Sequence, residues 1–154
     1  MNALFLKDLA DKTRRGLRGR VEAGRSGGGI CYGYRVNRTL ENGDVSKGHR
    51  EIVPEEAATV RGVFDEYEQG ISPKEIAKRL NRERIPGPNG SQWGPSTIHG
   101  HVGRGTGILN NELYVGRLVW NRQRYVKDPD TGKRLARRIR FRSGSRPMSR
   151  RFAL

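Results

Sequence analysis

The sequence has only one cysteine, Cys31, among its 154 residues. A disulfide framework needs at least two cysteines, and a structural zinc site usually needs several cysteine or histidine ligands. The three histidines, His49, His99 and His101, are too few and too badly spaced to supply a metal site. We therefore expect no metal and no cofactor.

Long apolar runs are also missing, because no stretch approaches the length of a membrane span or a signal peptide. A membrane-surface protein would need a long amphipathic helix with a continuous apolar face, and the sequence shows none of that length. These absences predict no membrane partner and a location in the cytoplasm, associated with the nucleoid.

Acidic residues are scarce: 16 Asp and Glu stand against 31 Lys and Arg, which gives a formal charge of +15. Such an excess concentrates polyanions, and DNA is the densest common one. The excess is uneven, because residues 39–70 carry three basic and eight acidic side chains, whereas residues 114–154 carry thirteen and two. This pattern predicts that one face meets DNA while an acidic segment stays away from it.

Periodicity predicts a mainly helical α+β fold that begins with a helical arm. Residues 3–23 have a rough helical period, with arginines in the second half. Gly24 ends this helix, and residues 25–29 read as a flexible glycine-rich linker. Two short strands, Tyr32–Val36 and Arg50–Val53, follow with a polar loop around residues 41–44 between them.

The middle of the chain predicts three helices. Pro54 opens the first and Gly70 ends it, with Ala57, Val60, Phe64 and Tyr67 on its buried face. A capping box at residues 72–75 starts the second, with an apolar side inward and a basic outer surface of Lys74, Lys78, Arg79 and Arg82. A third runs from about Gly94 through Val102 and completes a helix-turn-helix-like pair.

The last third predicts a short helix at residues 110–116 and a C-terminal β-hairpin. Its first strand is expected over Arg117–Val126, with a turn at residues 129–132 and a basic return strand. Trp93 and Trp120 are interpreted as core residues rather than platforms for stacking bases.

Three sets of side chains are predicted to contact DNA. The arm and linker provide arginines that can follow the minor groove: Arg14, Arg15, Arg18, Arg20 and Arg25. The third helix provides donors for phosphates and bases: Ser96, Thr97, His99, His101 and Arg104. The hairpin provides cations for the phosphate backbone, with Arg122 and Arg124 on one face: Arg117, Arg122, Arg124 and Lys127.

No residue is predicted to be catalytic. Ser26, Ser46 and Ser72 fall in a linker, a loop and a helix cap, and none has a nearby base and arginine cluster for attack on a phosphodiester.

An ordered series of motifs resembles the recombinase domain of the large serine site-specific recombinases. The resemblance covers roughly Lys12 to Arg138. The segments that carry it are Gly33-Tyr34, ISPKEIAKRLNRERI at 71–85, Gln92-Trp93, Ser96-Thr97-Ile98 and RGTGILNNELYVGRLVWNRQRYVKDPDTGKR at 104–134. The series departs from the family after about Arg138, which suggests a frame change or a truncation.

The resemblance implies how the chain is organised. Residues 1–24 correspond to the end of a long linker helix, 25–31 to the glycine-rich linker and 32–138 to the recombinase DNA-binding domain. Residues 139–154 form a basic tail that is expected to be disordered or aberrant. The family's catalytic serine domain, zinc ribbon and coiled coil are not expected here, so the chain alone is expected to be inactive in strand exchange.

The implied function is sequence-specific binding of double-stranded DNA at a recombination half-site, within bacterial or phage DNA integration. A full-length recombinase protomer is a further expected partner. Three alternatives stay open: a helix-turn-helix transcriptional regulator, an RNA-binding basic protein, and a remnant of a mobile element.

Overall fold

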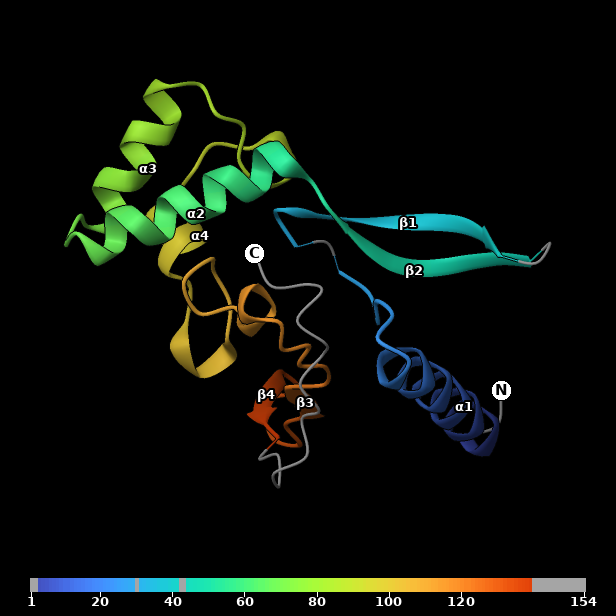
Figure 1. Cartoon of the computed structure of the whole chain (residues 1–154). Coiled ribbons are helices and arrows are strands. Elements are labelled where there is room, and N and C mark those ends of the chain that lie inside the picture. Colours follow the sequence, from blue (N-terminus) through green and yellow to red (C-terminus); the bar gives the residue numbers. More distant parts are fainter. Residues whose placement is uncertain (1–2, 30, 42–43, 140–154) are drawn as a thin grey trace.

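The computed structural model describes residues 3–29, 31–41 and 44–139. It describes four α-helices, three short 3-10 helices and two antiparallel β-hairpins, joined by irregular segments (Figure 1). The mainly helical α+β fold predicted from periodicity is confirmed. The tail predicted from residue 140 onwards lies outside the described residues.

Helix α1 spans Ala3–Glu22 and stands away from the rest of the molecule (Figure 1). Its first apolar side chains are exposed, with Leu4 at 71% and Leu9 at 51% of their full accessible surface. Among the described apolar side chains of α1, only Leu17 and Val21, near its C-terminal end, are partly buried. The helix is therefore attached to the fold at one end.

The first hairpin is longer than predicted. Strand β1, Tyr34–Glu41, pairs antiparallel with β2, Asp44–Ile52. The predicted polar loop lies partly outside the described residues, and Ser46, which the sequence placed in that loop, belongs to β2. A register shift opposite Asn37 and Arg38 leaves Gly48 as an extra residue with φ +108°, a conformation that suits glycine.

Helices α2, Pro54–Glu68, and α3, Pro73–Arg82, begin where their sequence signals predict. Proline stands at the start of each, and the Ser72 side chain accepts a hydrogen bond from the Glu75 N–H at 3.3 Å. On α3 the apolar residues Ile76, Ala77 and Leu80 are buried, as their spacing predicts.

Two details of these helices differ from the predictions. Tyr67 is 45% exposed, and Val63 is buried instead, because the core lies nearer the middle of α2 than the apolar period suggests. Arg79 is not a simple surface cation: it forms ion pairs with Glu66 of α2 and with Glu83. It therefore links α2 and α3.

The third helix is much shorter than predicted. Helix α4 spans only Pro95–His99, and Gly100 ends it with φ +64°. The chain then turns back on itself, with His101 bridged to Thr106 and a 3-10 turn, Val102–Arg104, between them. The predicted continuation through Val102 is therefore wrong.

The last third holds η3, Glu112–Val115, and a hairpin of β3, Gln123–Lys127, with β4, Arg134–Arg138. The C-terminal hairpin is confirmed, but the predicted strand over Arg117–Val126 is wrong in its first half. Residues 117–122 form an irregular segment that leads from η3 to the foot of the hairpin.

The core lies between α2, α3, α4 and η3. Its largest fully buried side chains are Ile76, Leu80, Ile98, Val60 and Val63. Trp93 is buried at 4% exposure, as predicted, and its ring meets Tyr32 edge-on with 4.9 Å between centroids. Trp120, in contrast, is only partly buried.

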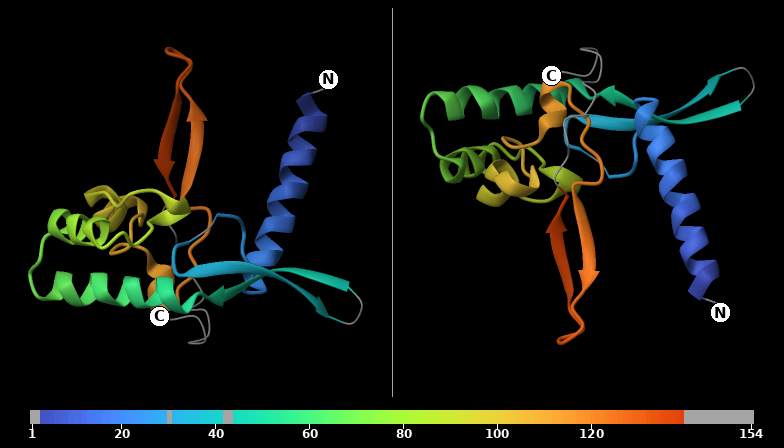
Figure 2. Two further views of the ribbon diagram at one scale, coloured as in Figure 1. Left: turned by 90° about the horizontal axis from the view of Figure 1, so that it is seen from above. Right: turned by 90° about the horizontal axis from the view of Figure 1, so that it is seen from below.

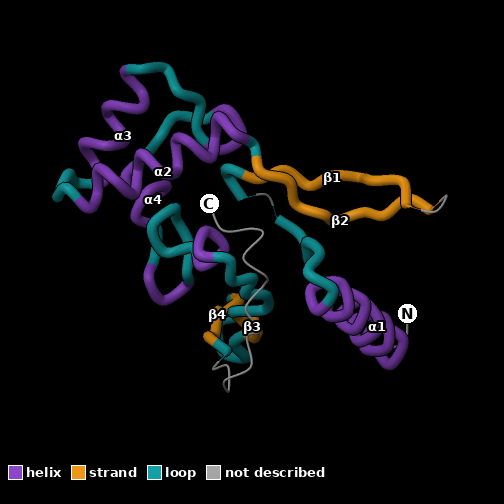
Figure 3. The backbone as a smooth tube through the Cα atoms, in the orientation of Figure 1, coloured by secondary structure: helices purple, strands orange, loops and turns teal. Residues whose placement is uncertain are grey.

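Two elements project from this body in the same general direction. The β3–β4 hairpin and α1 extend from one side, while α2 lies on the opposite side (Figure 2). The β1–β2 hairpin extends in a third direction, and loops connect all of these elements (Figure 3). Any partner that meets both α1 and β3–β4 must therefore approach from the side away from α2.

Candidate nucleic-acid interface

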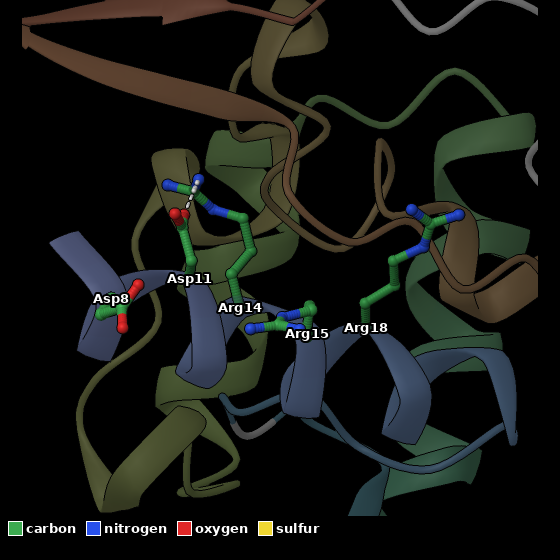
Figure 4. Close-up of a pocket in the computed structure, with 5 residues that line it drawn as sticks. All are labelled: Asp8, Asp11, Arg14, Arg15 and Arg18. Atoms are coloured by element: carbon green, nitrogen blue, oxygen red, sulfur yellow. Dashed lines mark ion pairs between the residues drawn. The ribbon is translucent and has the colours of Figure 1, made fainter.

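Three predicted contact residues, Arg14, Arg15 and Arg18, follow one another along α1 (Figure 4). Arg14 lies 3.6 Å from Asp11, and the Arg18 Nε lies 2.8 Å from Glu22. All four of these charged groups are exposed, and exposed pairs within a helix contribute little free energy. A phosphate can therefore replace either carboxylate at small cost.

The C-terminal end of this arm is fixed at the bulge of β2. The Ser26 N–H donates to the Gly48 carbonyl at 2.7 Å, and Ser26 is 6% exposed. A Cβ on Gly48 would lie 3.1 Å from the Arg20 guanidinium and 3.3 Å from the Arg25 Cβ. The glycine thus allows both predicted contact residues to pack close to β2.

The Arg50 side chain supports the same junction from β2. Its Nη2 donates to the Ser26 hydroxyl at 3.3 Å, and burial lowers the pKa of its guanidinium. Within the described part of the chain, its buried Nη1 has no hydrogen-bond partner. Arg50 therefore holds the linker rather than an outside ligand.

A second contact links the arm to the segment before β3. A Cβ on Gly27 would lie 2.8 Å from Val21 and 3.0 Å from the Trp120 ring, so only glycine fits there without displacement. Trp120 was predicted to be a core residue, and it packs instead between the arm junction and the hairpin segment. This packing fixes the C-terminal end of α1 relative to the C-terminal hairpin.

The second predicted set is divided between α4 and the turn after it. Ser96, Thr97 and His99 lie on α4, whereas His101 and Arg104 lie in the turn of residues 101–106. Ser96, His99, His101 and Arg104 are exposed, and Thr97 is partly buried. They form one surface, but not one face of a continuous recognition helix.

Close backbone approach explains why α4 stops at Gly100. A Cβ on this glycine would lie 1.8 Å from the Thr106 carbonyl oxygen, and a Cβ on Gly107 would lie 2.5 Å from the Gly100 nitrogen. The Asn110 side chain also donates to the His99 carbonyl at 2.6 Å. If α4 continued beyond Gly100, these contacts would be lost.

In the third predicted set, Arg122 packs against the rest of the protein instead of being free for contact with DNA. It lies outside β3, so it does not share a strand face with Arg124. Its guanidinium is 3.3 Å from Glu112 of η3 and packs where a Cβ on Gly105 would stand. Arg122 therefore braces the foot of the hairpin, while Arg117 is exposed on the segment that leads to it.

The hairpin itself presents cations on both faces. Arg124 pairs in register with Arg137, and Lys127 pairs with Arg134. Register places the first pair on one face and the second on the other. The like charges of Arg124 and Arg137 repel each other directly across the strands, which destabilises an isolated hairpin. An anionic partner would remove this repulsion.

Sequence reasoning missed the return strand as a source of contact residues. Arg134 stacks over the Tyr125 ring at 4.9 Å from the ring centroid, and Tyr125 is 57% exposed. Arg137 is also exposed. The signal was present in the Lys133-Arg134 and Arg137-Arg138 pairs, but the register of the hairpin was needed to place them.

Charge is separated between the two sides of the body. Helix α2 carries five acidic residues and only one basic one, Arg61. The span from Arg122 to Arg138 carries seven basic residues, and its two acidic ones, Asp128 and Asp130, lie in the turn. Because α2 and the β3–β4 hairpin lie on opposite sides of the body (Figure 2), the acidic residues of α2 are separated from the basic residues of the hairpin.

The buried polar groups near Cys31 serve the core. Asn111 donates to the Cys31 sulfur at 3.0 Å, and the Tyr114 hydroxyl donates to the Tyr32 carbonyl at 2.8 Å. Burial raises the pKa of the Cys31 thiol, so it is neutral and unreactive at ordinary pH.

Two kinds of site are absent from the part of the chain that the structure describes. No group of three or more histidine, cysteine or acidic side chains there could hold a metal ion. None of the helices in those same ranges has the length and apolar character needed to cross a membrane.

Comparison with known protein families identifies the C-terminal part of the chain. Residues 54–143 match the family model described as Recombinase, which is more than half of the chain. The matched range includes α2, α3, α4, the turn of residues 101–106 and the whole β3–β4 hairpin. No curated protein and no solved structure matches the chain.

Proposed function

The chain belongs to the Recombinase family, and on this premise we propose that it binds double-stranded DNA sequence-specifically at one half of a recombination site. The family connects the chain to DNA recombination. Our proposal adds the DNA contact itself, its specificity, and its role as the DNA-binding part of a serine recombinase.

One observation carries the proposal: α1 and the β3–β4 hairpin, which both carry exposed cations, project from the side opposite the acidic helix α2. Among the described residues, Arg15, Arg104, Arg124 and Lys127 are exposed and form no ion pair. Cations that lack internal partners and share one side of a molecule attract a polyanion to that side.

The geometry favours a duplex over a single phosphate group. The arm and the hairpin leave the body as separate projections, and their feet are connected through the contact of Trp120 with Gly27. We propose that the arm follows one stretch of backbone while the hairpin and the turn of residues 101–106 meet the next. Such contacts at several points fix both register and direction on a half-site.

The proposal is tested by selecting bound duplexes from a random pool with the whole chain and footprinting the selected sequence. We expect one asymmetric site, bound more tightly than unrelated duplexes. If about six phosphates are neutralised, the logarithm of the affinity should fall with the logarithm of salt concentration at a slope of about −5. Equal affinity for every duplex, or a preference for RNA in direct competition, would contradict the proposal.

A pair of variants separates DNA contact from general charge. Arg15→Ala removes an exposed cation on the arm, and Arg61→Ala removes an exposed cation on α2. We expect weaker duplex binding from the first and unchanged binding from the second.

A further inference from the structure

The element best shaped to read bases is the β3–β4 hairpin, although sequence reasoning assigned that role to the third helix. Helix α4 has five residues, a length of about 7.5 Å, and its C-terminal end is closed by the contact between Gly100 and Gly107. A helix of this length presents barely one turn of side chains to a groove. The turn of residues 101–106 adds only Arg104 as an exposed cation.

The hairpin has the dimensions of a groove-reading ribbon. Its two strands pair over five residues each, about 16 Å, and a two-stranded ribbon with its side chains is about 10 Å thick. The major groove of B-DNA is about 12 Å wide and admits such a ribbon, whereas the minor groove, at about 6 Å, does not. Among the described side chains of β3 and β4, Gln123 and Val126 are partly buried and the others are exposed, so each face has side chains open to contact.

One face of this ribbon holds the side chains that discriminate bases best. Gln123, Tyr125 and Lys127 alternate on β3, and Arg134 lies across from Lys127. The Tyr125 hydroxyl donates to the Gln123 Oε1 at 3.4 Å, and the Arg134 guanidinium stacks on the same ring. Glutamine and arginine form bidentate contacts with adenine and guanine in the major groove. Here Tyr125 orients both Gln123 and Arg134.

The opposite face is suited to phosphates. Arg124 and Arg137 lie side by side there, next to the apolar pair Val126 and Leu135. Neither arginine is held by a ring or a carboxylate in the described structure, so their long side chains can reach the walls of the groove. Contacts of this kind add affinity without reading sequence.

The foot and the tip of the hairpin are both held in place. At the foot, Arg122 pairs with Glu112, and the Ile139 N–H donates to the Arg122 carbonyl at 2.9 Å. At the tip, Asp128 accepts hydrogen bonds from the Thr131 hydroxyl and the Asp130 N–H, which lower the pKa of its carboxyl. A fixed foot and a closed turn allow an exposed ribbon to present side chains in one orientation.

We propose that the β3–β4 hairpin enters the major groove of the half-site, where Gln123 and Arg134, both oriented by Tyr125, read adjacent base pairs. Arg124 and Arg137 contact the flanking phosphates. This inference rests on the proposed duplex binding and names the element that gives it specificity.

The test compares selections from a random duplex pool by the whole chain and by single variants. Gln123→Ala and Arg134→Ala should each lose preference at one or two base pairs, with discrimination falling about tenfold or more at those positions. Arg124→Ala and Arg137→Ala should select the unchanged site with lower affinity and a shallower salt slope. Thermal unfolding of each variant shows that the fold is intact.

Two further variants sharpen the comparison. Tyr125→Phe keeps the ring under Arg134 but removes the hydroxyl that orients Gln123, so it should weaken only the preference that depends on Gln123. Arg104→Ala, in the turn after α4, should lower affinity but leave the base preferences of the hairpin unchanged. Arg61→Ala on α2 is the matched control and should change neither affinity nor preference.

A further experiment identifies the groove that the hairpin enters. The selected duplex is made with a 7-deazapurine at one position at a time, because this base lacks the N7 acceptor that a purine presents in the major groove. Loss of binding is expected at the same base pairs that Gln123→Ala and Arg134→Ala affect. The inference is overturned if the hairpin variants keep every base preference, if Arg104→Ala removes those preferences instead, or if 7-deazapurines have no effect. Failure of the unmodified chain to bind any duplex would instead reject the proposed function itself.

Discussion

Helix α2 and the β3–β4 hairpin use their surfaces in opposite ways. Helix α2 buries Ala57, Val60 and Val63, and one of its carboxylates, Glu66, pairs with Arg79. The hairpin buries none of its described side chains and carries arginines opposite each other. The first region obtains its stability from its own core. The second is exposed, and its facing Arg124 and Arg137 have no carboxylate partner among the described residues.

The comparison predicts where the largest stability losses fall. Leu80→Ala removes a side chain with no exposed surface, so we expect a loss of about 3 kcal/mol in the free energy of unfolding. Leu135→Ala, on the hairpin at 44% exposure, should cost less than about 1 kcal/mol. Urea denaturation followed by the fluorescence of buried Trp93 measures both, and similar losses would remove the distinction between the regions.

For DNA affinity we expect the reverse: substitutions on the hairpin should have large effects and a substitution on α2 should have none. Replacing both Arg124 and Arg137 by alanine removes two phosphate contacts, which is worth about 60-fold in affinity, or roughly 2.5 kcal/mol, in about 0.1 M salt. The salt slope should become shallower by about two. Arg61→Ala on α2 is the control with unchanged affinity. A double variant that binds as tightly as the original chain would show that the hairpin is not part of the interface.

Alkaline pH should destabilise the fold through the buried Tyr34. Burial raises the pKa of Tyr34 from 10 to about 12, so between these values the folded chain keeps a proton that the unfolded chain has lost. Stability from this group is complete below pH 10 and is lost as pH rises through 12, by up to about 2 kcal/mol. Denaturation measured between pH 9 and about 12 should show a smaller decline for Tyr34→Phe.

The smallest expected effect concerns the brace between η3 and the foot of the hairpin. Arg122→Ala removes a partly exposed ion pair with Glu112 and the packing over Gly105, so it should cost about 1 kcal/mol of stability. Arg117→Ala, exposed on the same segment, should cost almost nothing. Equal stability of the two variants in urea would show that Arg122 does not hold the hairpin.

Local signals were reliable wherever they acted within a few residues. Proline at the first turn, the Ser72 cap and the apolar spacing of α3 all act over short distances, and the structure agrees with each of them. Longer patterns were less reliable. The apolar period placed Tyr67 in the core, although the position of neighbouring elements leaves it exposed.

The candidate site shows the same division. Arg124 and Lys127 are exposed on the hairpin, where the sequence placed them. Arg122 belongs to a brace, because Glu112 and Gly105 meet it only after the chain has folded back. Arg134 and Tyr125 form their stack through cross-strand register, which no local pattern specifies.

The sequence by itself determined the helices α2 and α3, the charge of the chain and its family, because caps, periods, composition and ordered motifs are local or additive properties. Tertiary structure alone decided where α4 ends, how the arm is fastened and which arginines are free. Each of these depends on contacts between distant segments: Gly100 with Gly107 and Thr106, Ser26 with Gly48, and Arg122 with Glu112.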